Sequence, residues 1–277
     1  MMEHRGRMTK LLVSSTVFCT LLAGAVIAEA QQQEVNPAPA AKDWADVAKL
    51  PDWSGVWVPD ISDQNRQARE NKTPWTPTAG RQIAEMFAAE AAGRPAGIFN
   101  NCLPEGMPTW MLISHNALEF LFTPGRVTML GESDGNRLRR IYTDGRPHPE
   151  DPDLTFHGHS IGRWEGDTLV IDTVGILPEV YLAPNEGVGI PIGDNAHIVE
   201  RMRLVGPSTL HDELEITAPH VLSAPWKTTR IYYRQRVRNF DIIEGVCLQG
   251  NFIDQVDEHG NAIFVPVPRQ KESEGTK

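Results

Sequence analysis

The sequence predicts a mainly β protein that folds as an antiparallel barrel with one helix near its N-terminus. From residue 110 onward, short runs of apolar and β-branched residues alternate with turn signals about every ten residues, which is typical of barrels and sandwiches. The clearest hairpin joins residues 155–164 to residues 168–174 through the tight turn Glu165-Gly166-Asp167. The 23 glycines and 21 prolines supply the many turns that such a fold needs.

The predicted helix is an Ala- and Glu-rich stretch at residues 78–93, in which Ile83, Phe87 and Ala91 fall on one face. Thr78 is the expected N-cap, and the glycine and proline that follow end the helix. The expected strands are residues 52–58, 119–122, 127–130, 138–142, 155–164, 168–174, 197–205, 214–217 and 226–237.

No linker interrupts residues 51–268, so we expect them to form a single β-barrel domain. Residues 31–50 contain little that a core could bury and are expected to be a disordered leader, with a short helix at 43–50. Residues 269–277 are expected to be a disordered tail.

The first thirty residues have the pattern of a secretory signal peptide. Three basic residues precede an uncharged apolar run at residues 11–28, which ends in Ala28-Glu29-Ala30. These features predict cleavage after Ala30 and a periplasmic or secreted mature protein. A membrane anchor is the alternative, but the small residues at the end of the run favour cleavage.

Cleavage would leave Cys102 and Cys247, which are candidates for one disulfide in an oxidising compartment. Two separate thiols are the alternative. The full chain has a formal net charge of −10, which disfavours nucleic acids and anionic membranes as partners.

Four segments resemble a widespread family of exported, largely uncharacterised bacterial proteins. They are residues 120–126 (FLFTPGR), 140–146 (RIYTDGR), 158–173 (GHSIGRWEGDTLVIDT) and 194–201 (DNAHIVER). The resemblance implies export but no particular activity. In addition, Gly55-Val56-Trp57 resembles the G-x-W of the first strand of lipocalin-like barrels, which implies an interior that holds small apolar molecules.

Four residues are candidate catalytic groups: His159, Asp172, His197 and Glu200. Asp172 lies on the partner strand of His159, and an aspartate that orients a histidine is a common arrangement for a general base. Glu200 interrupts the apolar face of its strand, so it should either meet an arginine or have a raised pKa. The alternatives are a structural ion pair of Glu200 with Arg140 or Arg230, and an Asp172 that satisfies backbone groups.

Polar residues also alternate along one face at Arg140, Tyr142, Asp144 and Arg146, continuing to His148, and are candidates for binding a substrate carboxylate or phenol. A solvated strand face is the alternative.

We expect no metal or other cofactor. The alternative is a zinc site of His157, His159 and His197, because residues two apart on a strand, such as His157 and His159, share a face.

The sequence therefore favours an exported enzyme that uses histidine and carboxylate acid–base chemistry on a small, largely apolar or aromatic molecule. Lyase, isomerase and hydrolase reactions all fit this description. A non-catalytic periplasmic carrier of such molecules is the alternative, and a structural protein with internal charged struts is a third hypothesis.

Overall fold

The structure is a computed structural model. It describes residues 36, 38–99, 103–113, 117–245, 253–256 and 262–264. The predicted signal peptide, the C-terminal tail and both cysteines of the predicted disulfide, Cys102 and Cys247, lie outside the described residues.

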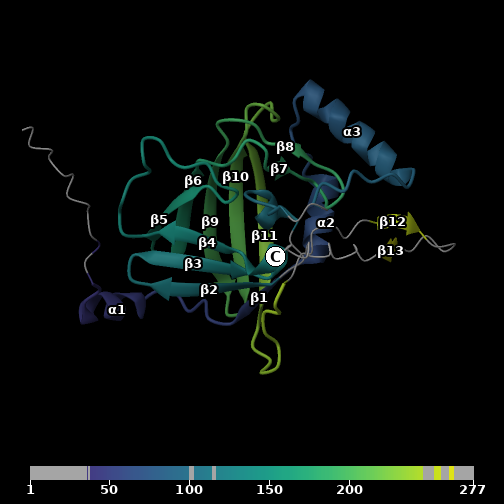
Figure 1. Cartoon of the computed structure of the whole chain (residues 1–277). Helices are drawn as coiled ribbons and strands as arrows, with labels where there is room; N and C mark the ends of the chain where they lie inside the picture. The colour runs from purple at the N-terminus through teal and green to yellow at the C-terminus, as the bar shows by residue number, and fades with distance from the viewer. Residues whose placement is uncertain are drawn as a thin grey trace, which may run out of the picture. The chain divides into compact units, whose positions relative to one another are not determined.

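Nine strands close into a barrel, which confirms the mainly β, lipocalin-like fold class (Figure 1). Around the barrel the strand order is β1-β11-β10-β9-β6-β5-β4-β3-β2, and β2 returns to pair with β1. All neighbours are antiparallel except β4 and β5, which run parallel and are joined by the long loop 143–158. The strands are β1 Val56–Pro59, β2 Leu118–Thr123, β3 Arg126–Gly131, β4 Leu138–Tyr142, β5 His159–Glu165, β6 Thr168–Val174, β9 His197–Gly206, β10 Thr209–Thr217 and β11 Trp226–Gln235.

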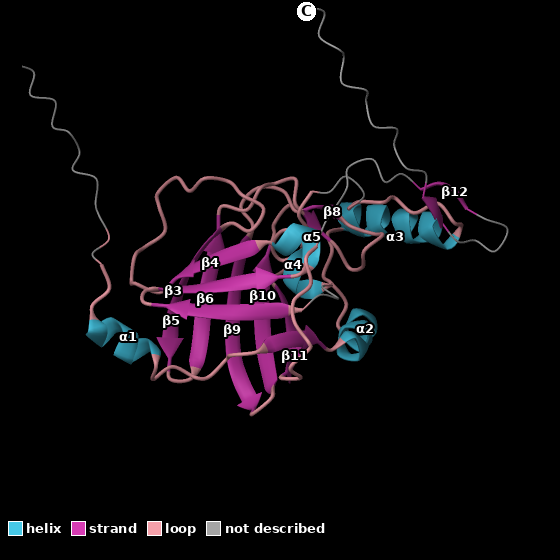
Figure 2. Cartoon of the chain, turned by 60° about the horizontal axis from the view of Figure 1, so that its bottom comes forward, coloured by secondary structure: helices cyan, strands magenta, loops and turns pink. Residues whose placement is uncertain are grey.

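The two longest helices lie beside the strands of the barrel (Figure 2). The predicted helix is α3, Pro77–Ala91, but its N-cap is Thr76, whose hydroxyl accepts a hydrogen bond from the Ala79 amide. Helix α2, Ile61–Glu70, was not predicted, and it packs against β11. Three short helices are α1 Ala41–Val47, α4 Thr109–Leu112 and α5 Ser133–Asn136. None of the helices in the described part of the chain has the length and apolar character needed to cross a bilayer.

Helix α1 falls inside the segment predicted as a leader, where a short helix was expected, and none of its residues is buried. Two small antiparallel pairs lie outside the barrel sheet. They are β7 Tyr181–Leu182 with β8 Ile190–Pro191, and β12 Ile253–Val256 with β13 Ala262–Phe264.

The inward-facing positions of the barrel carry bulky side chains that contact one another. Trp57 of the G-x-W segment is fully buried, and its indole nitrogen donates to the Trp53 carbonyl at 2.9 Å. The Trp53 ring packs edge-on against Phe120 and Trp164, at centroid distances of 5.1 and 5.4 Å. Such aromatic pairs add to the stability that their burial gives.

A buried ion pair crosses the interior between β4 and β9. The guanidinium of Arg139 binds the carboxylate of Glu200 through both terminal nitrogens, at 2.9 Å for Nη1 and Oε1, and both side chains are about 99% buried or more. Arg139 also donates to the hydroxyls of Ser160 on β5 and Thr173 on β6, which bond each other at 2.9 Å. The pair is thus bidentate and hydrogen-bonded, as a buried charge pair requires.

Removing one partner should be costly, because the other charge would stay buried without compensation. We expect Arg139→Met to lower the free energy of unfolding by about 3–5 kcal/mol, measured by urea denaturation. The double variant Arg139→Met/Glu200→Leu should recover much of this loss. As a control, Arg163→Met breaks an exposed pair with Glu165 and should cost less than about 1 kcal/mol. Equal losses for the two single variants would contradict this role.

Candidate functional site

Three of the four predicted catalytic residues meet on the outer face of the barrel. His159 begins β5, Asp172 lies on β6 and His197 begins β9, and each faces away from the interior. His148, from the loop 143–158, links them: its Nδ1 lies 2.8 Å from His159 Nδ1, and its Nε2 lies 3.0 Å from Asp172 Oδ1. His197 Nε2 lies 3.0 Å from the same oxygen. We call these four residues the histidine relay.

The relay fixes which nitrogen of each neutral histidine carries the proton. A carboxylate only accepts hydrogen bonds, so His148 must donate to Asp172 through Nε2–H. Its Nδ1 is then an acceptor, and His159 must donate to it through Nδ1–H. The free lone pair of His159 therefore sits on Nε2, at the end of a chain that begins at Asp172.

The relay is partly open to solvent. The side chains of His148, Asp172 and His197 are 20%, 34% and 42% exposed. Burial lowers the pKa of His159, and the nearby His148 and Arg146 lower it further. His159 is therefore kept in its neutral form, in which Nε2 is a base.

The predicted substrate-binding residues adjoin the relay in part. Tyr142 stacks on the His159 ring at a centroid distance of 5.4 Å, and the Arg146 guanidinium lies 4.2 Å from the Tyr142 ring. Asp144 accepts from Arg146 Nε at 2.9 Å, and this contact lowers the pKa of Asp144. Arg140 is exposed on the outer face of β4. Segments 140–146, 158–173 and 194–201 thus converge on one place.

Glu200, the fourth predicted catalytic residue, lies on the other side of the barrel wall from the relay. It faces inward, as its place on the apolar side of β9 predicts, and pairs with Arg139. The partners named as alternatives were Arg140 and Arg230, and neither is correct. Arg140 faces outward because side chains alternate along β4, and Arg230 bonds a backbone carbonyl and Thr228.

His157 and His159 do not share a face, so the expectation for this pair was wrong. Gly158 between them has φ +68°, and a side chain there would meet the Val174 carbonyl at 2.6 Å. This turn starts β5 only at His159 and directs His157 against the edge of Trp110. The zinc candidates His157, His159 and His197 are therefore not brought together, and no group of three or more His, Cys, Asp or Glu among the described residues is arranged to hold a metal ion.

His148, the fourth residue of the relay, was predicted only as the end of the polar face that starts at Arg140, and not as a catalytic group. It continues the alternation of polar residues that starts at Arg140, and this pattern was its signal in the sequence. The pattern could not predict the contact of His148 with Asp172. That contact depends on the path of the proline-rich loop 143–158, which brings His148 over β6.

We expect two-bond ¹H–¹⁵N NMR correlations at pH 8 to show His148 as the Nε2–H tautomer and His159 as the Nδ1–H tautomer. Asp172→Ala removes the fixed acceptor, so both histidines should then show mixed tautomers. His220, whose nearest carboxylate oxygen is on Asp194 at 3.7 Å, should not change. Finding His159 as the Nε2–H form in the unmutated protein would contradict the relay.

The buried His157 predicts a loss of stability in acid. Both ring nitrogens are buried without a hydrogen-bond partner among the described residues, and burial, with Arg139 and Arg137 nearby, lowers its pKa from 6.5 to about 4. The unfolded chain therefore binds this proton first, so stability falls as pH drops from 6.5 to 4, by about 3 kcal/mol in full. His157→Phe should flatten this slope in urea unfolding, whereas exposed His220→Phe should not. An unchanged slope in His157→Phe would contradict the assignment.

Comparison with models of known protein families finds no match for the chain. Comparison with curated proteins finds none with significant similarity.

Proposed function

We propose that the protein is an exported enzyme that catalyses acid–base chemistry on a small, largely apolar or aromatic molecule, with His159 as the general base. The observation that carries the proposal is the hydrogen-bonded chain from Asp172 through His148 to His159. The predicted signal peptide and the resemblance to exported proteins support a periplasmic or secreted location.

In the proposed step, His159 Nε2 removes a proton from a substrate carbon or from an attacking water. His148 accepts a hydrogen bond from Nδ1–H of the resulting His159 imidazolium, and Asp172 stabilises the positive charge through His148. His197 holds the same Asp172 oxygen and so fixes the orientation of the carboxylate. Isomerases, lyases and hydrolases all have such a step.

Two neighbours of the relay support the substrate class. The Tyr142 ring, which stacks on His159, brings an aromatic side chain next to the base, and the charge of Arg146 lies close enough to lower the pKa of His159. Arg146 is therefore placed to favour negative charge that develops on a carbonyl or phenol oxygen of the substrate.

A carrier that holds its ligand inside the barrel has less support. The inward-facing positions are occupied by side chains that are almost fully buried, among them Trp57, Arg139, Met129 and Tyr232. Close packing of this kind leaves little room for a ligand.

The experiment is a turnover screen of the purified exported protein with aryl esters, aromatic lactones and β-elimination substrates. For any substrate that is turned over, His159→Gln should lower kcat/KM by about 100- to 10,000-fold, since general base catalysis contributes about this much. The matched control His220→Gln should retain full activity. An unchanged kcat/KM in His159→Gln would refute the proposed role.

The pH profile gives a second test. The base acts only when neutral, so kcat/KM should fall as pH drops through the lowered pKa of His159, below 6.5. Arg146→Gln removes a positive charge and should move this acid limb to higher pH. An acid limb that stays at the same pH in Arg146→Gln would show that Arg146 does not lower the pKa of His159.

A further inference from the structure

A recess lies where α2 passes over β11. In the barrel, β9 and β10 lie between β11 and β6, the strand that carries Asp172 of the histidine relay. It is a cavity of about 110 Å³. Its lining is mixed: Ile61, Leu112, Ile113 and Trp226 form an apolar part, amide side chains of α2 form a polar part, and Arg230 lines it from the strand. We call it the α2 cleft.

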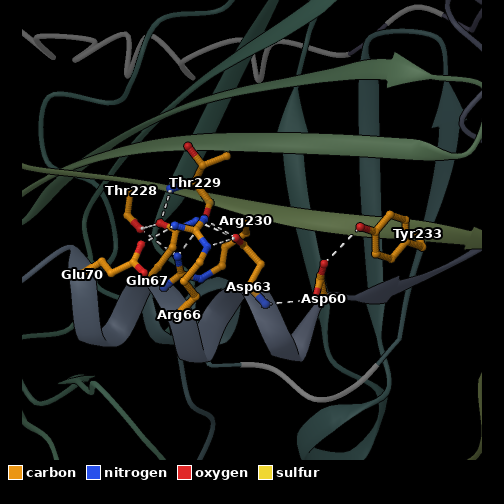
Figure 3. A network of polar contacts seen from close by, with 9 residues as sticks. All are labelled: Asp60, Asp63, Arg66, Gln67, Glu70, Thr228, Thr229, Arg230 and Tyr233. Carbon is orange, nitrogen blue, oxygen red and sulfur yellow. Dashed lines mark hydrogen bonds and ion pairs between the residues drawn. The ribbon is translucent and has the colours of Figure 1, made fainter.

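Two amide side chains at this cleft, Gln67 of α2 and Asn71 at its C-cap, are hydrogen-bonded to β11. Gln67 donates to the Thr229 carbonyl at 2.6 Å and accepts from the Thr228 hydroxyl at 2.8 Å, as Figure 3 shows. Asn71 donates to the Lys227 carbonyl at 2.7 Å. These contacts hold the helix in place and leave the cleft as a built recess.

Arg230, unlike these amide side chains, carries a charge, and this charge is buried without an ion-pair partner among the described residues. The residue is 5% exposed. Its Nε donates to the Leu112 carbonyl at 2.8 Å, and its Nη1 donates to Thr228 and to the Thr229 carbonyl, all neutral acceptors. Within the described residues, Nη2 donates no hydrogen bond and Arg230 forms no ion pair.

The two acidic groups that face Arg230 do not neutralise it. Asp63 is paired with Arg66 and bonded by Gln67 (Figure 3). Asp212 is opposite Arg230 on β10, fully buried, and neither of its oxygens has a hydrogen-bond partner among the described residues. Burial, and then the nearby Glu200, raise the pKa of Asp212 well above its usual value, and among the described residues Asp212 forms no ion pair with Arg230.

We propose that the α2 cleft binds a small organic monocarboxylate, whose carboxylate contacts Arg230 and whose hydrocarbon part packs on Leu112, Ile113 and Trp226. A buried charge without a partner is unfavourable, and an anionic ligand supplies that partner. The small volume limits the hydrocarbon part to a few carbons. A dianion such as phosphate fits less well, because Arg230 is the one cationic side chain among the described residues that line the cleft, and the exposed Glu186 also lines it.

Sodium butyrate and its neutral isostere butyramide are the probes, added to the ¹⁵N-labelled exported protein at constant ionic strength. In ¹H–¹⁵N correlation spectra, butyrate should shift the backbone amides of Asn71 and Ala183 and saturate, and butyramide should bind at least tenfold more weakly. Arg230→Gln should remove this preference for the charged probe. Equal affinity for both probes, or no saturable shift with butyrate, would overturn the proposal.

Since Arg230→Gln removes a buried side chain, a second variant leaves the barrel untouched. Ala68 is exposed on α2 and lines the cleft, so Ala68→Trp should fill it and weaken butyrate at least tenfold. Ser62→Trp, at an exposed α2 position that does not line the cleft, should leave the affinity unchanged. Unaltered binding in Ala68→Trp, or shifts with inorganic phosphate but not butyrate, would refute the monocarboxylate site.

Discussion

The buried pair of Arg139 and Glu200 ties four neighbouring strands together. Arg139 on β4 reaches Ser160 on β5, Thr173 on β6 and Glu200 on β9. A shift of one residue in any of these strands would turn its partner outward and leave a buried charge or donor without a partner. The register of β4, β5, β6 and β9 is therefore set by polar contacts as well as by apolar packing.

That register also places the histidine relay. His159 precedes Ser160, and Asp172 precedes Thr173, so side chains held inside the barrel fix their chain neighbours outside it. His197 lies on the face of β9 opposite to that of Glu200. The wall thus has a rigid inner layer and an outer layer that carries the proposed chemistry, which is how precise sites are usually supported.

The fold and much of the site followed from local patterns. Alternation along β9 predicted that Glu200 faces inward, and the Gly166-Asp167 turn predicted the β5–β6 hairpin. The failures came where chain geometry overrides alternation. Gly158 breaks the strand and separates His157 from His159, and the partner of Glu200 proved to be Arg139, one residue from the expected Arg140. The link through His148 depends on a loop path that no periodicity encodes.

The parallel pairing of β4 and β5 has a consequence for how this protein can change over evolution. Parallel neighbours cannot be joined by a tight hairpin, so the long loop 143–158 connects the end of β4 to the start of β5. That loop supplies His148 and Arg146, whereas His159, Asp172 and His197 belong to the strands. Insertions or replacements in the loop can therefore change the substrate preference or the basicity of His159 while the barrel keeps its hydrogen bonds. Topology here separates a part free to diversify from a part that must be inherited nearly unchanged.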